Sequence, residues 1–171
     1  MIDERMNEAI NDQINAELWS AYIYYAMGQW FEDQDLPGMA QWMYAQTQEE
    51  IFHADKFARY VNERGGRAVM KAIEAPPEEW DSPVAVFEHA LEHEQMVTGR
   101  INDLVDLAIE INDHASRNFL AWYVDEQVEE EDNVGGVLAQ VKRAVDSPNA
   151  LMMMDRELGS RVFTPPAGEE E

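Results

Sequence analysis

Long proline-free stretches with apolar side chains at helical spacing constrain this chain most. Residues 2–33 contain no proline and predict one helix of about 30 residues. Asp35-Leu36-Pro37 predicts a turn and the start of a second helix, with Asp35 as its N-cap, and Gly65-Gly66 ends that helix near residue 64. Because the connection between them is short, the two helices are expected to be antiparallel neighbours.

The rest of the chain predicts three more helices. Residues 65–81, with a strand-like stretch at 68–70, form a linker long enough to cross the length of a bundle. Ser82-Pro83 starts a third helix to about residue 112, residues 115–145 form a fourth, and residues 148–159 form a short fifth. The fold class is therefore expected to be all-α: a four-helix bundle with a long crossover between helices two and three and a short fifth C-terminal helix.

Two details of the C-terminal half complete this expectation. Residues 1–163 are expected to form a single bundle domain, and residues 164–171 a flexible acidic tail. Gly135-Gly136 falls inside the fourth helix, where each glycine costs roughly 1 kcal/mol relative to alanine. We expect a kink or a close helix contact there.

Composition excludes several classes of function. The 35 acidic and 12 basic residues give a net charge of -23, which disfavours nucleic acid and anionic membranes and attracts cations. The absence of cysteine excludes disulfides, thiolate metal sites and thiol catalysis, so oxygen and imidazole ligands remain. The N-terminus has no signal-peptide pattern and no apolar run reaches the length of a membrane span, so a cytoplasmic protein is expected.

A carboxylate and an imidazole, Glu50 and His53, lie three residues apart in the second predicted helix. At 3.6 residues per turn they share one face and can reach one metal ion. Taken alone, this spacing also fits an ordinary surface Glu-His pair. The acids on the other predicted helices are what distinguish the two interpretations.

Each long helix carries polar groups where its period calls for an apolar side chain. Buried carboxylates a few Å apart repel each other and take up protons unless divalent cations lie between them. In antiparallel helices these acids fall at matching heights, and two divalent ions would balance four carboxylates. Oxygen ligands with one imidazole suit iron or manganese, which suggests O₂ or peroxide chemistry. The residues are Glu17, Glu50, Glu94, Gln127 and Glu130, with Tyr24 two turns after Glu17.

The third helix holds a second dense cluster of possible ligands. His89 and His93 are spaced to bind one metal ion, and Glu88 and Glu92 accompany them. These four residues are expected to lie mostly on the solvent face, flanking the buried Glu94.

The residues resemble the non-haem ferritins of bacteria and archaea, and most closely the archaeal members. The likeness extends over nearly the whole chain. It is carried by Asn11-Asp12-Gln13-Ile14-Asn15-Ala16-Glu17, Glu49-Glu50-x-x-His53, Trp80-Asp81-Ser82-Pro83, Glu92-His93-Glu94, Phe119-Leu120-x-Trp122 and the acidic run at 126–131.

The resemblance implies a ferritin-like bundle with a di-iron ferroxidase centre in each subunit. It implies that Glu17 and His53 hold the first iron and that Glu50 bridges the two ions. Glu94 and Glu130 would hold the second iron.

The resemblance also implies roles for residues around the two irons. Gln127 would lie beside the second iron, and Tyr24 would act near the centre as a hydrogen-bond partner or electron donor. A third iron site would be formed by Glu49, Glu126, Glu129 and the shared Glu130.

The implied function is iron storage and detoxification. Fe²⁺ would be oxidised by O₂ or H₂O₂ and kept as a ferric mineral inside a hollow homo-oligomeric shell of 24 subunits. Bacterioferritins place a haem-binding Met directly after the bridging Glu, and this chain has Ile51, so no haem is expected. They also carry a second E-x-x-H where this chain has Glu130.

Two other functions remain open at this stage. One is a di-iron or di-manganese oxidase of the same fold acting on an organic substrate, which needs an apolar pocket opening onto the metals. The other is a non-enzymatic shell or a DNA-protecting assembly, which the charge of -23 disfavours.

Overall fold

The computed structural model describes residues 1–166, which form five helices in the predicted order. No strand is present in this part of the chain, and most of the expected acidic tail, residues 167–171, lies outside it. The helices are α1 (Glu4–Asp33), α2 (Pro37–Glu63), α3 (Pro83–Glu110), α4 (His114–Ala144) and α5 (Pro148–Leu158).

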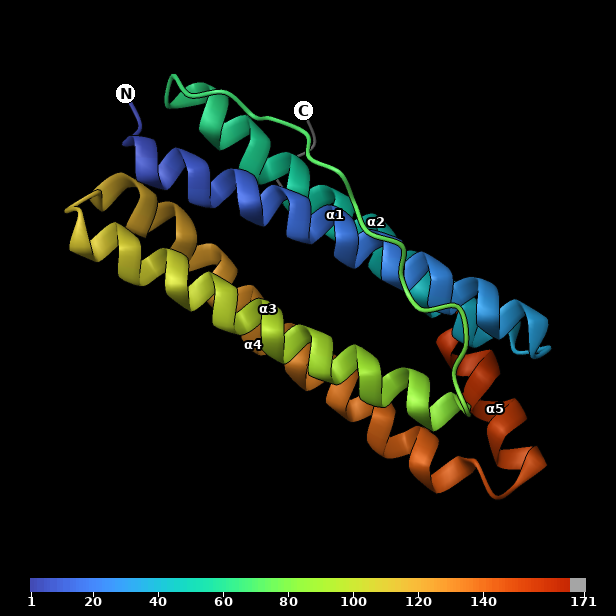
Figure 1. The fold of residues 1–171 in the computed structure, drawn as a ribbon. Helices are drawn as coiled ribbons and strands as arrows, with labels where there is room; N and C mark the ends of the chain where they lie inside the picture. Colours follow the sequence, from blue (N-terminus) through green and yellow to red (C-terminus); the bar gives the residue numbers. More distant parts are fainter. Residues whose placement is uncertain (167–171) are drawn as a thin grey trace.

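The four long helices form two antiparallel pairs (Figure 1). α1 packs on α2 and α3 on α4, while α1 also meets α3. α2 and α4 meet through side chains, and the ring of Phe57 stacks on that of Tyr123 with centroids 3.9 Å apart. α5 packs across one end of the bundle against α2 and α4.

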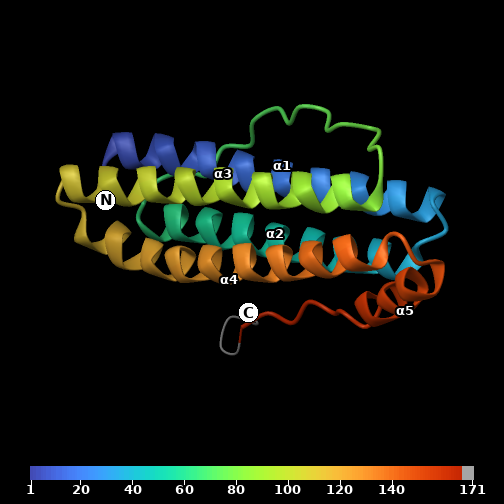
Figure 2. The same ribbon diagram turned by 90° about the horizontal axis from the view of Figure 1, so that it is seen from below.

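The segment between α2 and α3 crosses the length of the bundle, as predicted (Figures 1 and 2). Its strand-like start forms no strand, because one side chain satisfies its backbone. The Asn11 amide donates to the Arg67 carbonyl at 3.0 Å, and its oxygen accepts from the Val69 N–H at 2.6 Å. Asn11 thus fixes the crossover to α1.

Three helices end in a residue with left-handed backbone: Asp35 (φ 57°), Gly65 (φ 74°) and Asn112 (φ 58°). At the end of α1 the Leu36 N–H donates to the Phe31 carbonyl at 3.0 Å, the bond that closes a Schellman motif. The prediction of Asp35 as the N-cap of α2 is therefore wrong. Asp35 terminates α1, and the N-cap position of α2 is Leu36, whose side chain makes no capping bond.

The missing cap of α2 comes from α5. Asp155 accepts from the Met39 N–H at 2.9 Å through its carboxylate, satisfying one of the unpaired donors of the first turn. The two helices approach closely here. A Cβ on Gly38 would lie 1.7 Å from the Asp155 carbonyl oxygen, and one on Gly159 would lie 3.2 Å from the Gly38 Cα.

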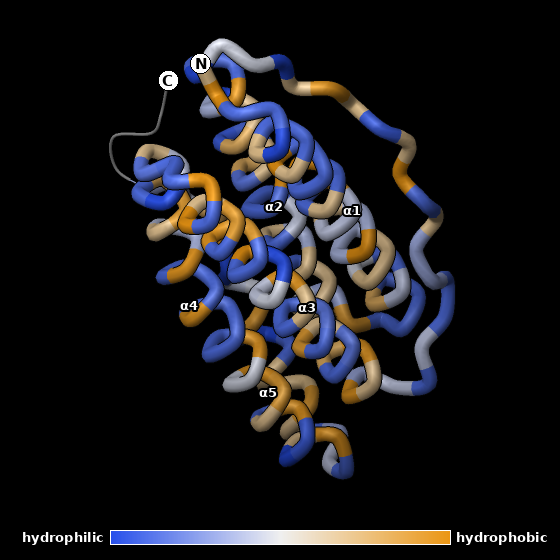
Figure 3. Tube along the Cα trace, turned by 60° about the vertical axis from the view of Figure 1, so that its left-hand side comes forward, coloured by the Kyte–Doolittle hydropathy of each residue, from blue (hydrophilic) through white to orange (hydrophobic). Residues whose placement is uncertain are grey.

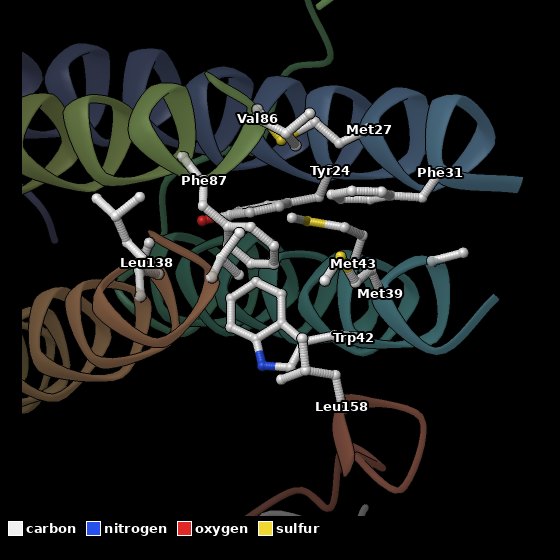
Figure 4. Packing of buried hydrophobic residues seen from close by; sticks show 14 of the residues in the cluster. Tyr24, Met27, Phe31, Met39, Trp42, Met43, Val86, Phe87, Leu138 and Leu158 are labelled. Carbon is white, nitrogen blue, oxygen red and sulfur yellow. The ribbon is translucent and has the colours of Figure 1, made fainter. Parts of the chain in front are cut away.

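The apolar core falls into two clusters along the bundle. One includes Tyr24, Trp42 and Phe87, which Figure 4 shows packed together between the helices. The other includes Phe57 and Tyr123. Figure 3 shows hydrophobic and hydrophilic stretches alternating along the long helices, as helices with one apolar face require. The buried acids come between these clusters in each helix sequence.

α4 runs through Gly135 and Gly136 without interruption. Apart from the adjacent residues and the nearby backbone of α4 itself, a Cβ on either residue would have no heavy atom of residues 1–166 within 4 Å. The expected close helix contact is therefore wrong within the subunit. Among residues 1–166 no helix combines the length and apolar character that a membrane span requires.

The contact between α2 and α5 predicts opposite effects for two glycine substitutions. Gly38→Ala should lower the free energy of unfolding by about 1–3 kcal/mol, because its methyl group overlaps the Asp155 backbone. Gly99→Ala, in a helix position with open space, should raise it by about 0.5–1 kcal/mol. Denaturant unfolding of both variants tests this. Equal stability of the two variants would contradict the tight contact.

Candidate metal centre

Four glutamates, one from each long helix, are buried in the interior of the bundle. Each side chain is no more than 2% exposed. They lie near the middle of helices that run antiparallel in pairs, which brings them to similar heights. The prediction that these acids face inward is confirmed for Glu17, Glu50, Glu94 and Glu130.

Glu17, Glu50 and His53 form the inner cluster, in which one potential ligand atom of each residue lies within 4.8 Å of the others. His53 Nδ1 is 3.4 Å from Glu50 Oε2, one helical turn away on the same face of α2. The surface-pair interpretation of this Glu-x-x-His spacing is therefore wrong, since both side chains are buried.

Donor groups hold the other two carboxylates. Glu94 accepts from the Tyr24 hydroxyl and, at 3.3 Å, from Gln127 Nε2. Glu130 accepts from Gln46 Nε2 at 2.8 Å. These hydrogen bonds orient both carboxylates, through both oxygens of Glu94 and through Oε2 of Glu130.

Two buried glutamines were not predicted as part of this site. Gln46 bonds Glu130 as described, and Gln13 Nε2 donates to Glu17 Oε1 at 2.9 Å. Gln13 lies four residues before Glu17 on α1, and Gln46 lies four residues before Glu50 on α2. That spacing was the sequence signal that could have found them.

Burial shifts the titration of the whole centre. It raises the pKa of Glu17 to about 7 and, together with the neighbouring carboxylates, raises the pKa of Glu50 and Glu130 well above their ordinary values. Burial also raises the pKa of Glu94 and lowers that of His53 to about 3. The metal-free centre therefore holds protons on its carboxyl groups and keeps a neutral imidazole, the form that binds metals.

Glu49, His53 and Glu126 form the outer cluster, whose ligand atoms also lie within 4.8 Å of one another. His53 is thus shared between the two clusters. Glu129, expected at the third iron site, is exposed and does not belong to the outer cluster. Arg161, which the sequence did not indicate, donates to Glu49 Oε2 at 2.8 Å.

The cluster on α3 differs from its predicted solvent-face position. Glu88 and Glu92 are exposed, but His93 is buried and its Nε2 lies 2.8 Å from Ser20 Oγ on α1. Burial lowers the pKa of His93 to about 4. His89 instead accepts from Trp80 Nε1 at 3.0 Å, so the two rings have different partners.

This chain is similar to known proteins over nearly its whole length. Residues 7–144 match the Ferritin family, described as a ferritin-like domain. A bacterial non-heme ferritin of Bacteroides fragilis is 42% identical over 161 residues, 94% of this chain and 100% of that protein. One from Staphylococcus aureus is 37% identical over 163 residues, 95% of this chain and 98% of that protein.

Solved structures of archaeal ferritins share the fold. A closed form of the Archaeoglobus fulgidus ferritin, engineered by site-directed mutagenesis, has a TM-score of 0.95 and 48% identity, covering 96% of this chain and 100% of that one. An open pore ferritin from the same archaeon has a TM-score of 0.93 and 48% identity, covering 94% and 99%. With this agreement in sequence and fold, the chain belongs to the ferritin family, alongside bacterial non-haem ferritins and archaeal ferritins.

Proposed function

We propose that this protein oxidises Fe²⁺ to Fe³⁺ with O₂ or H₂O₂ and stores the product as a ferric mineral inside a hollow shell of its own subunits. The observation that carries the proposal is the convergence of four buried glutamates and His53 from all the long helices. Such a centre has only oxygen and imidazole donors, which suit iron. Isolated buried carboxylates would be costly without cations between them.

Each residue of the centre has a role in this proposal. Glu17 and His53 hold one Fe²⁺, Glu50 bridges, and Glu94 and Glu130 hold the other. The two ions are substrates, and each gives up one electron. O₂ takes both electrons and two protons to form H₂O₂, or H₂O₂ takes them and two protons to form two molecules of water.

Tyr24 and Gln127 act on the second ion through Glu94. Tyr24 donates to Glu94 Oε1 and Gln127 donates to Oε2, so the two hydrogen bonds fix the carboxylate, and each oxygen keeps a second lone pair for the metal. Burial and the surrounding carboxylates raise the pKa of Tyr24 well above its ordinary value, so the phenol keeps its proton and remains a donor. It is also placed to supply an electron to the centre.

A third iron ion would bind at the outer cluster, beside the inner one. Glu49 and Glu126 are only partly buried, so this site is closer to solvent than the inner cluster. Glu130, buried next to Glu49, and the exposed Glu129 complete the acidic surroundings. The oxidised iron would then pass into a shell of 24 subunits, toward which the net charge of -23 attracts further cations.

Iron oxidation and iron retention test the function together. Fe²⁺ is added in air to metal-free protein, to Glu50→Gln and to Glu92→Gln, and ferric absorbance and iron per particle are measured. Glu50→Gln should slow oxidation by at least about tenfold. Loss of a residue that only supports a metal ligand already reduces affinity or activity by about tenfold or more, and Glu50 is proposed as a ligand itself. Glu92→Gln removes the same charge from an exposed position and should behave like the native protein.

The native protein should retain hundreds of irons per assembled particle. That number requires a mineral, because binding sites alone would hold only a few irons per chain. Retention of only about two irons per chain, without mineral, would refute storage. An oxidase acting on an organic substrate would then become the function to test.

Metal binding should release protons, because Fe²⁺ displaces them from carboxyl groups whose pKa is raised. Affinity for Fe²⁺ without oxygen should therefore increase as the pH rises from about 6 to 8, through the pKa of about 7 of Glu17. A pH indicator in weakly buffered protein measures the released protons. Glu17→Gln should release fewer, and an affinity independent of pH would contradict the protonated centre.

A further inference from the structure

The chain after α5 returns along the bundle beneath α2 and α4 (Figure 2). We call residues 159–163 the C-terminal segment. Its backbone is fixed to α2, because Gln41 Nε2 donates to the Arg161 carbonyl at 3.1 Å. Its end is fixed by Phe163, whose ring centroid lies 5.7 Å from that of Phe52.

This path brings a positive charge to the outer cluster. Arg161 Nη2 lies 2.8 Å from Glu49 Oε2, and both side chains are partly buried. The guanidinium carbon sits 4.5 Å from the ring centroid of Trp42, a cation–π contact on the other side. Backbone, ring and carboxylate together hold the guanidinium at one position.

Glu49 therefore has two competing uses. One of its oxygens is bonded to Arg161, and its carboxylate is also a potential ligand with His53 and Glu126. A divalent cation bound at the outer cluster would lie close to the guanidinium and be repelled by it. At short separations near a protein surface, this repulsion reduces affinity by about tenfold or more.

We propose that Arg161 is a built-in counter-ion of the outer cluster: it neutralises Glu49 when no metal is bound there and is displaced when a divalent cation binds. It weakens the outer cluster, where Glu49 is paired with the guanidinium, relative to the inner one, where the ion pair given for Glu50 is with the shared His53. Iron at the outer cluster consequently stays exchangeable. This inference rests on the metal binding proposed above and adds a residue that sets the order in which the sites fill.

Zn²⁺ binding tests the inference without any redox step. Calorimetric titration of the full-length, metal-free protein should resolve tight inner sites and a weaker class. Arg161→Gln should increase the affinity of the weaker class about tenfold and leave the tight sites unchanged. Glu49→Gln, alone or combined with Arg161→Gln, should remove the weaker class.

Two further variants separate charge from structure. Arg156→Gln removes an exposed arginine from α5 and should leave both classes unchanged. Arg161→Lys keeps the charge and should restore the native affinity even if it anchors the segment less well. A purely structural role would lower thermal stability in Arg161→Gln without changing Zn²⁺ affinity, and that result overturns the inference.

The two proposals fail differently. If native protein binds no Zn²⁺ tightly, the proposed metal centre is wrong and this inference falls with it. The tight sites could instead fill while the weaker class in Arg161→Gln has the same Zn²⁺ affinity as in native protein or is missing. In that case only the role of Arg161 is refuted.

Discussion

The cost of burying four carboxyl groups governs this structure. Each long helix gives up an apolar position in its interior stripe to a glutamate. Burial favours the protonated form of these carboxyl groups, and hydrogen bonds from Tyr24, Gln46 and Gln127 satisfy oxygens of Glu94 and Glu130 that would otherwise be buried without a partner. The apolar clusters on either side supply the stability that this polar layer does not, so the bundle folds around a set of carboxyl groups that are costly to bury.

Much of the fold could be predicted from the sequence, because its determinants are local. Proline marks the start of three helices and glycine follows the end of two, and Ser82 caps α3 as expected, accepting from the Ala85 N–H at 3.1 Å. The inward direction of Glu17, Glu50, Glu94 and Glu130 follows from helical period alone. Asp35 was misplaced because aspartate suits both an N-cap and a left-handed helix end, and local sequence does not decide between them.

The parts that could not be predicted depend on contacts between distant segments. His93 is adjacent in sequence to the buried Glu94 and is buried as well. Its burial depends on the packing of α3 against α1, where its ring meets Ser20. Gln46 donates across the bundle to Glu130, and Arg161 reaches Glu49 from the end of the chain. Periodicity describes one helix at a time, so it identifies which residues face inward but not which residues they meet.

The carboxylate that caps α2 from α5 has a consequence for the order of synthesis. Asp155 follows Met39 by 116 positions, so α2 leaves the ribosome long before its cap exists. Until then, nothing but solvent satisfies that amide of the first turn of α2, and the end of the bundle stays open to fraying. Docking of α5 therefore completes the subunit as a late event, and nascent chains halted before residue 155 lack a finished surface at that end.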